Sequence, residues 1–382
     1  MTQSTVAFHR HLGLLDDSSS GHKKSIKLAP PLDWKSFMIT SKIQVDDLES
    51  LMVKMLRKVD VTPANARDIA WVFKTMTLRG VGHHDIGSFP GIIRNLRDGV
   101  FNPRPKIKTV VSKQATAVMD ADNAPGTLAA FRMTEKAILK ARKYGIGIVT
   151  MRNSNHFLGS AAYNLLAAEQ DMIGITMSNT LASMAAHGSK DKAIGNNPWG
   201  FAAKTGAEFP IMLDIANAYA SFGKLFDYMN NNWDIPREWG LDELGENTSD
   251  PSRVLRGGVS LPMAGHKGFG LAIMVELLTS ILAGGAITEN VRMNSLEGNG
   301  HSQASIVINI NHFLPVATFE DRTKEMVELL HNHEPLDSEK PVLLPGERSY
   351  TSRKKLADEG IVLNQKTVDE LTQLLDELNI RT

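Results

Sequence analysis

Histidines, a lysine and polar side chains gather in three loop segments whose residue types could carry chemistry. The first is His83-His84-Asp85, in a glycine-bracketed loop directly after an expected helix. An imidazole titrates at about pH 6.5, so it can give and take a proton near neutrality. Taken alone, the segment is also typical of a solvated loop. Adjacent side chains diverge, so two neighbouring histidines make a poor metal site by themselves.

The other two segments are placed for substrate and phosphate. Arg152-Asn-Ser-Asn-His156 follows an expected strand, and open α/β sheets bind ligands beyond the carboxyl ends of their strands. Gly265-His-Lys-Gly-Phe-Gly270 leads into an expected helix, where backbone N–H groups beside a lysine attract phosphate. The purely structural alternatives are a helix-capping loop for the first of these segments and a tight turn for the second. Neither Gly-x-Gly-x-x-Gly nor a Walker-type Gly-Lys-Ser/Thr occurs, so the usual nucleotide fingerprints are absent.

Alternating strands and helices are expected to position these loops. Helical periodicity begins after a Ser41/Gln44 capping box, and Thr62-Pro63 opens a second helix that ends near Gly80. The expected strands are Thr116–Asp120, Ile146–Met151, Met172–Ser178, Pro210–Ala216 and Ser305–Ile310, with helices at Gly126–Lys143 and Leu158–Glu169. Such alternation predicts βαβ units and a largely parallel sheet. The apolar segment Leu271–Leu282 predicts a buried helix, and Thr367–Leu378 an amphipathic one opened by a Thr367/Glu370 capping box.

Composition narrows the class of protein. The 382 residues, 42% of them hydrophobic, can bury the cores of about two domains. Formal net charge is zero, which argues against nucleic acid as the main partner, because phosphate binding needs a basic face. The chain has no cysteine, which excludes disulfides and thiolate chemistry. No apolar run reaches the length of a membrane-spanning helix, so no membrane association is expected.

Six segments, in this order, resemble the type-2 malate/L-lactate dehydrogenase family, which includes ureidoglycolate dehydrogenase, 2,3-diketogulonate reductase, sulfolactate dehydrogenase and the piperideine-2-carboxylate reductases. They are His84-Asp-Ile-Gly-Ser-Phe-Pro90, Arg152-Asn-Ser-Asn-His156, Gly195-Asn-Asn-Pro198, Asp214-Ile-Ala216 with Gly223-Lys224, Gly265-His-Lys-Gly268 and Leu344-Pro-Gly-Glu347. The resemblance runs from about Val45 to Leu378. It implies an α/β fold with a mixed, largely parallel sheet, unlike the Rossmann domain, and with helical N- and C-terminal segments.

The resemblance also implies an organisation into parts and an assembly. The expected parts are a flexible extension, 1–40, an N-terminal helical and substrate segment, 41–115, a cofactor-binding α/β domain, 116–330, and a C-terminal segment, 331–382, that packs back on the N-terminal one. A homodimer is implied, with the active site between the cofactor domain and the terminal segments. We expect a cytoplasmic protein. A mitochondrial presequence is the less favoured alternative because Asp16 and Asp17 are unusual in one.

Functional residues follow from the resemblance position by position. His84 falls on the proton donor of several members, and His156 on a second active-site histidine, treated as the proton acceptor in ureidoglycolate dehydrogenase. The implied cofactor-binding residues are Thr180, Asp214, Ile215, Ala216, Lys267, Pro345, Gly346 and Glu347. The implied activity is hydride transfer between NAD or NADP and a 2-hydroxy or 2-oxo carboxylic acid, without a metal.

Three departures from the family pattern bear on the substrate. The family's Ser-His-Gly is His83-His84-Asp85 here, and Gly-Thr-Asn-Pro is Gly195-Asn-Asn-Pro198. Ser88 stands where the family often has an arginine, four residues after the donor histidine. Since a guanidinium binds a carboxylate through two parallel bonds, its loss predicts weak activity on dicarboxylates. Arg94, Arg152 and Arg348 are the sequence candidates to replace it.

Three other functions remain open from the sequence. Gly265-His-Lys-Gly268 and Pro345-Gly-Glu-Arg348 look like the piperideine-2-carboxylate reductases, which favours a reductase of cyclic imines. His83, His84 and Asp85 could instead serve a metal-dependent hydrolase. A binding protein without catalytic activity is the third alternative.

Overall fold

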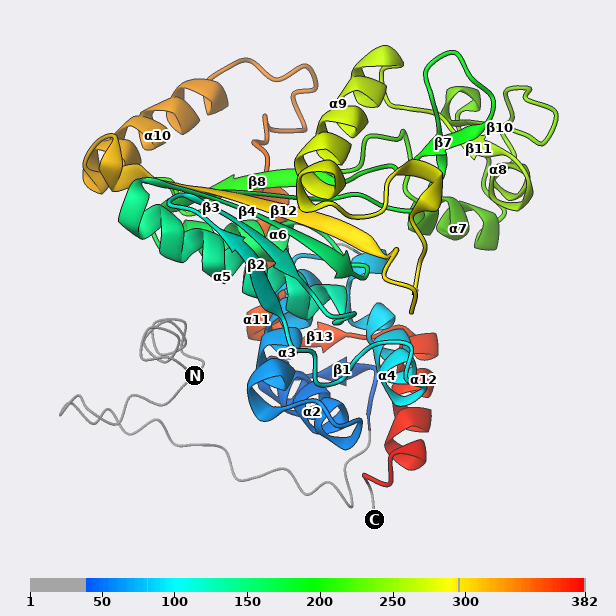
Figure 1. Ribbon diagram of the computed structural model, residues 1–382. Helices are drawn as coiled ribbons and strands as arrows, with labels where there is room; N and C mark the ends of the chain where they lie inside the picture. The colour runs from blue at the N-terminus through cyan, green and yellow to red at the C-terminus, as the bar shows by residue number, and fades with distance from the viewer. Residues whose placement is uncertain (1–38, 81, 295, 381–382) are drawn as a thin grey trace.

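The computed structural model describes residues 39–80, 82–294 and 296–380, and the expected extension, 1–40, lies almost wholly outside them (Figure 1). A seven-stranded sheet forms the centre, in the order β2-β3-β4-β12-β5-β8-β9. In that order the strands are Lys108–Ser112, Thr116–Asp120, Ile146–Ser154, His301–Asn309, Met172–Ser178, Trp199–Ala203 and Ile211–Ile215.

The sheet is mixed, which confirms the predicted α/β class, but most strand directions differ from the prediction. Only β3 and β4 run parallel, and every other neighbouring pair in this sheet is antiparallel. The main cause is β12, which enters from late in the chain between β4 and β5 and runs antiparallel to both. Alternating strands and helices therefore indicated the class correctly, but not the insertion of a distant strand.

Helices cover both faces of the sheet (Figure 1). On one face lie α5, Gly126–Tyr144, and α6, Ala161–Ala168. On the other lie α9, His266–Glu276, and the π-helix η4, Leu277–Ile281. The close fit of α5 depends on Gly147 of β4, because a Cβ there would lie 2.0 Å from the Ala137 carbonyl oxygen.

The predicted burial of Leu271–Leu282 is wrong for one face. Ala272, Val275 and Glu276 are buried against the sheet, but large apolar side chains point away from it. The exposed ones are Ile273, Leu277, Ile281 and Leu282. A surface helix with apolar residues all round leaves an apolar stripe uncovered, and that stripe needs a separate explanation.

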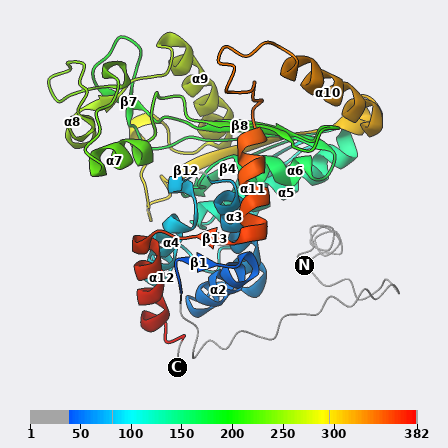
Figure 2. The ribbon, with the colours of Figure 1, turned by 180° about the vertical axis from the view of Figure 1, so that it is seen from behind.

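The two ends of the chain pack together below the sheet. Strands β1, Lys42–Ile43, and β13, Ile361–Val362, pair antiparallel. Around them lie α2, Val45–Lys58, α3, Pro63–Leu78, α4, Phe89–Arg97, α11, Glu347–Glu359, and α12, Gln365–Glu377. Both views show α12 beside α4, and Figure 2 shows α11 in front of α3 (Figures 1 and 2). The division into four parts stays a prediction.

Helix caps show how far the local signals hold. The Thr62 hydroxyl accepts from the Asn65 N–H and caps α3, as predicted. Gln44 caps α2 without a side-chain bond, so the expected capping box is wrong. The α12 cap is Asn364, which accepts from the Thr367 N–H. Thr367 is therefore inside the helix, because an asparagine upstream supplies the cap.

The remaining elements surround the site or the far edge of the sheet. A four-stranded sheet has the order β10-β11-β6-β7, with strands Gly240–Leu241, Val259–Ser260, Met184–Ala185 and Lys192–Ile194. Helices α7, α8 and α10 span Phe222–Asn230, Pro251–Arg256 and Val316–His331. Short 3₁₀ turns are η1, Gly82–His84, η2, Ile86–Ser88, η3, Arg237–Trp239, η5, Thr288–Asn290, and η6, Ile310–His312. None of the described helices is long and apolar enough to cross a membrane. The cytoplasmic location stays a prediction.

Candidate active site

Three histidines from three elements form one wall of a cavity of about 830 Å³. His84 ends the turn η1, His156 follows β4, and His301 begins β12. The His84 and His156 ring centroids are 5.3 Å apart, and those of His156 and His301 are 6.2 Å apart. The structure thus brings the two predicted catalytic histidines together and places a third histidine beside them. We call this group the histidine wall.

Strand pairing places His301 beside His156. His301 pairs with Ser154 at the end of β4, and a register shift follows before Gln303 pairs with Met151. The Gln303 side-chain amide donates to the Asn155 carbonyl oxygen at 3.0 Å, which ties the two strand ends together. Sequence reasoning missed His301 because it belongs to no motif and precedes the expected strand start, Ser305. The only signal was a histidine shortly before an apolar segment that was predicted as a strand.

A backbone bond orients the His156 ring. The Leu158 N–H donates to His156 Nδ1 at 3.3 Å. Leu158 has a φ of +70°, a strained conformation for a leucine and one that is often found near functional sites. Because Nδ1 accepts this bond, the neutral ring carries its proton on Nε2. His156 is therefore a hydrogen-bond donor at Nε2 when it is uncharged.

His301 is buried and electrically neutral. The residue is 1% exposed, and neither ring nitrogen has a hydrogen-bond partner among the described residues. Burial, reinforced by the nearby His156, lowers the pKa of His301 to about 3. A buried polar group without a partner costs roughly 1–3 kcal/mol, so this side chain is expensive to keep unless it contributes to function.

Asp214, Ile215 and Ala216, at the end of β9, also line the cavity. The Asp214 carboxylate accepts from the Ser160 N–H at 3.2 Å, the Ser160 hydroxyl at 2.8 Å and the Ala161 N–H at 3.1 Å. It therefore satisfies the N-terminus of α6, where a negative charge is favourable. Gly159 makes this approach possible, because a Cβ there would lie 2.6 Å from Asp214 Oδ2.

Thr180 also lines the cavity, and a buried carboxylate anchors it through an asparagine. The Thr180 N–H donates to Asn197 Oδ1 at 3.1 Å, and the Asn197 amide donates to Glu276 at 2.7 Å. The Thr180 hydroxyl donates to Asn196 Oδ1 at 3.1 Å. Since Glu276 lies on α9, this chain of bonds fixes the loop of Thr180 to the helix behind the sheet.

Lys224 is the one lysine or arginine among the described residues that line the cavity. It lies in the first turn of α7, where the Ser221 hydroxyl accepts from the Lys224 N–H. Its ammonium lies 4.6 Å from the Trp239 ring centroid, a cation–π contact. A helix N-terminus with a lysine beside it is suited to a carboxylate or a phosphate. We call Lys224 and the start of α7 the cationic wall.

The sequence candidates for a carboxylate-binding arginine lie elsewhere. Arg152 donates to Asp120 at 3.2 Å, and Arg94 lies 3.9 Å from Glu370. Neither these two nor Arg348 lines the cavity. Ser88, half-buried before α4, does not line it either.

The remaining predicted cofactor residues also lie outside the cavity wall. Lys267 is exposed in the first turn of α9, a few residues from the lining residue Met263. The Pro345 carbonyl oxygen accepts from the Met212 N–H at 3.0 Å, and Glu347 lies 3.0 Å from His331. Their roles in cofactor binding stay predictions.

Asp85 orders the loop that carries His84. Asp85 Oδ1 accepts from the Gly87 N–H at 2.8 Å and caps the turn η2. Within the described part of the chain, no group of three or more histidine, aspartate or glutamate side chains is arranged to hold a metal ion.

Known proteins share this architecture over nearly the whole chain. The sequence profile of the malate/L-lactate dehydrogenase family matches residues 43–372. A malate dehydrogenase of Pyrococcus abyssi is 31% identical over 89% of this chain and 96% of its own length. The structure of a sulfolactate dehydrogenase of Methanocaldococcus jannaschii superposes with a TM-score of 0.82, at 33% identity, covering 88% of this chain and 97% of that one. A Δ¹-piperideine-2-carboxylate reductase of Pseudomonas syringae superposes with a TM-score of 0.79, at 27% identity, covering 88% and 100%.

Proposed function

The chain belongs to the malate/L-lactate dehydrogenase family, and we propose that its cavity transfers a hydride between a nicotinamide dinucleotide and carbon 2 of a small 2-oxo or 2-hydroxy carboxylic acid. The observation that carries this proposal is that the histidine wall and the cationic wall line one and the same cavity. Proton-handling and anion-binding groups there can act on one small molecule. The chain is an oxidoreductase of this family's dehydrogenase type.

The cavity residues fit a nicotinamide dinucleotide. Thr180 and Asn196 offer polar atoms, Ala216, Ala218 and Ala220 leave room for flat rings, and the α7 N-terminus suits an anionic group. When bound, the nicotinamide supplies or accepts the hydride, and the protein supplies position and electrostatics. Neither NAD nor NADP is favoured by these residues.

We assign the proton transfer to His84. A carbonyl oxygen that gains a hydride develops negative charge, and an imidazolium that donates a proton relieves it. His84 is half-buried, so it can exchange its proton with solvent between turnovers. His156, with Nδ1 held by Leu158, presents the proton of Nε2 and is suited to orient the substrate oxygen.

His301 acts through His156 as a positioning residue. It packs edge-on against the His156 ring and stays uncharged, so it supports that ring without adding a second positive charge. A charged group at this place would repel protonated His84 and His156. This role gives a functional reason for a buried side chain whose ring nitrogens have no hydrogen-bond partner among the described residues.

Lys224 provides the cation for the substrate carboxylate. A charge-assisted bond of this kind contributes about 1.5–3 kcal/mol. A single ammonium in the cavity wall suits a monocarboxylate better than a dicarboxylate.

The direct test is a screen of reduced NAD and NADP oxidation, followed by absorbance, against 2-oxo acids and cyclic imino acids. We expect turnover with a 2-oxo monocarboxylate. The similarity to the piperideine-2-carboxylate reductase favours cyclic imines as the second candidate substrate class. A pure, folded protein that binds neither dinucleotide would refute the proposal.

We further propose that the protein works as a homodimer, with the apolar stripe of α9 and η4 in its interface. Ile273, Leu277, Ile281 and Leu282 are 40–55% exposed in the single chain, and a contiguous apolar stripe of this kind is typical of an interface. Light scattering should give twice the mass of the chain for the wild type and a lower mass for Leu277→Glu. A wild-type monomer would contradict this.

A further inference from the structure

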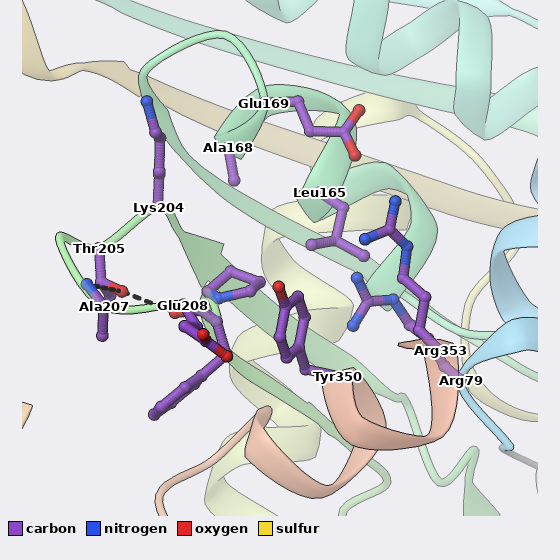
Figure 3. A pocket seen from close by; sticks show the side chains of 12 residues that line it. Arg79, Leu165, Ala168, Glu169, Lys204, Thr205, Ala207, Glu208, Tyr350 and Arg353 are labelled. Carbon is purple, nitrogen blue, oxygen red and sulfur yellow. Dashed lines mark hydrogen bonds between the residues drawn. The ribbon is translucent and has the colours of Figure 1, made fainter. Parts of the chain in front are cut away.

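A second cavity, of about 390 Å³ (Figure 3), lies at the opposite end of α6 from the catalytic cavity. The N-terminus of α6 bonds to Asp214 in the catalytic cavity, and its last residues, Leu165 and Ala168, line the second one. Eight helical residues span about 12 Å, and no residue lines both cavities. The two cavities are therefore separate sites.

Two arginines from different ends of the chain share this second cavity. Arg79 follows α3 and is 5% exposed, whereas Arg353 lies on α11 and is exposed. Figure 3 shows their side chains extending side by side toward Leu165 and Glu169. The structure therefore assembles two guanidiniums from positions 274 residues apart in the sequence.

Arg79 is incompletely satisfied. Its Nε has no hydrogen-bond partner among the described residues, and its Nη1 makes one long bond, 3.4 Å, to the Ser349 hydroxyl. Burial, with Arg353 as the second cause, lowers the pKa of Arg79 to about 10, and Glu169 only partly opposes this. The Arg79 guanidinium therefore has an unused hydrogen-bond donor beside a second positive charge.

The other ionic side chains around the cavity do not supply negative charge to this pair. Lys204 lies 2.7 Å from Glu320, outside the cavity, and Glu208 lies 3.3 Å from Lys354. Two guanidiniums thus face one carboxylate, Glu169, and an additional anion would balance them.

The walls also offer room for more than a bare ion. Phe209 is buried, and Pro210, Leu165 and the half-buried Tyr350 ring complete an apolar side. In Figure 3 the Tyr350 ring stands beside the arginines. Two planar guanidinium forks bind the oxygens of a phosphate in pairs, and the apolar side can receive the carbon body attached to it.

We propose that this arginine pocket is a second binding site, which takes the phosphate monoester of a small metabolite. A phosphate monoester presents three terminal oxygens to the two guanidiniums, whereas a carboxylate presents two. The phosphate can belong to a free metabolite or to the adenosine end of a dinucleotide, since both present the same group. The site goes beyond the proposed hydride transfer and does not depend on it.

The test is calorimetric titration of the full chain with inorganic phosphate. Arg353→Gln removes one fork at an exposed position, so the fold is retained. Lys355→Gln is the matched control, because Lys355 is exposed on the same helix and does not line the pocket. We expect saturable binding in the wild type and the control, and binding at least about tenfold weaker in Arg353→Gln. No saturable binding, or equal affinity in Arg353→Gln, would overturn the proposal.

Further variants separate the two cavities and the two sources of phosphate. Lys224→Met removes the anion-binding lysine of the catalytic cavity, so saturable phosphate binding should persist in it, and loss of binding in that variant alone would place the phosphate in the catalytic cavity and refute the site. Arg79→Lys should also weaken binding, with thermal unfolding as the check that it folds. Competition by adenosine monophosphate that is lost in Arg353→Gln would support the site. If the whole dinucleotide competes with inorganic phosphate for the arginine pocket, the phosphate that the pocket binds belongs to the cofactor.

Discussion

The two walls of the catalytic cavity differ in how firmly they are held and how much water reaches them. His301 is buried on a central strand, whereas Lys224 is exposed in the first turn of a short helix. His156 and His301 are held by the pairing of β4 with β12, and Lys224 depends on one cap and a cation–π contact. Proton transfer needs fixed geometry, whereas capture of an anion benefits from a long, mobile cation. The difference predicts that chemistry and affinity can be damaged separately.

The largest effect is expected at His84. His84→Ala should lower turnover by about 10²–10⁴-fold, because the developing oxyanion loses its proton donor. Dinucleotide affinity should hardly change, since His84 is not among the residues proposed to hold the dinucleotide. Steady-state kinetics and a fluorescence titration of the dinucleotide measure the two quantities. His333→Ala is the matched control, an exposed histidine outside the cavity. Near-normal turnover in folded His84→Ala would transfer the role to His156.

A smaller effect, on affinity, is expected at the cationic wall. Lys224→Met should raise the KM for the acid substrate about tenfold or more, because a charge-assisted bond of roughly 1.5–3 kcal/mol is lost. Turnover at saturation should change little. Lys267→Ala is the comparison, since the sequence assigns Lys267 to cofactor phosphates and predicts about tenfold weaker dinucleotide binding. Identical kinetics of Lys224→Met and wild type would remove the cationic wall from the binding site.

Features that depend on neighbouring residues were predicted well from the sequence, whereas the pairing of strands distant in the chain was predicted poorly. Thr62-Pro63 marks a helix start that depends on nearby residues alone, and it was found. His84 and His156 were named from motifs, and the structure brings their rings together. His301 could not be named, because its place depends on β12 entering the sheet between two strands from much earlier in the chain. The exposed face of α9 was missed for a related reason, since an apolar helix reads the same whether a core or a partner subunit covers it.

The next effect is a pH dependence of stability caused by His301. Its pKa in the folded protein, about 3, lies below the ordinary 6.5, so between these values the unfolded chain binds a proton that the folded chain does not. This proton-binding difference therefore leaves the unfolding free energy at its full value above pH 6.5 and lowers it as the pH falls toward 3. Lowering the pH from about 7 to about 5 should cost about 2 kcal/mol of unfolding free energy from this residue.

His301→Leu isolates that contribution. At neutral pH the variant should be as stable as the wild type or more so, because a buried polar group without a partner is removed. Its unfolding free energy, from urea titrations at both pH values, should depend less on pH. Turnover should fall, and the pH profile of kcat/KM should shift, since the His156 ring loses its support. An unchanged profile with unchanged turnover would leave His301 a structural residue only.

The smallest effect is expected at Ser88, which tests whether the cavity lacks a second cation. Ser88 is half-buried before α4 and does not line the cavity, and Lys224 is the one lysine or arginine among the described lining residues. A dicarboxylate such as oxaloacetate would therefore have one carboxylate without a charged partner. We expect the wild type to prefer 2-oxo monocarboxylates, including those with a neutral or bulky tail.

Ser88→Arg should raise kcat/KM for oxaloacetate relative to pyruvate by about tenfold, the low end for a charged bond, because a guanidinium can reach farther than the serine hydroxyl and bind in two places. Ser88→Gln, similar in length and uncharged, is the control that separates charge from bulk. If the wild type already prefers oxaloacetate strongly and Ser88→Arg gains nothing, the second carboxylate is bound elsewhere. In that case Lys224 cannot be the sole cation that the substrate meets, and a charged group from outside the described cavity wall must contribute.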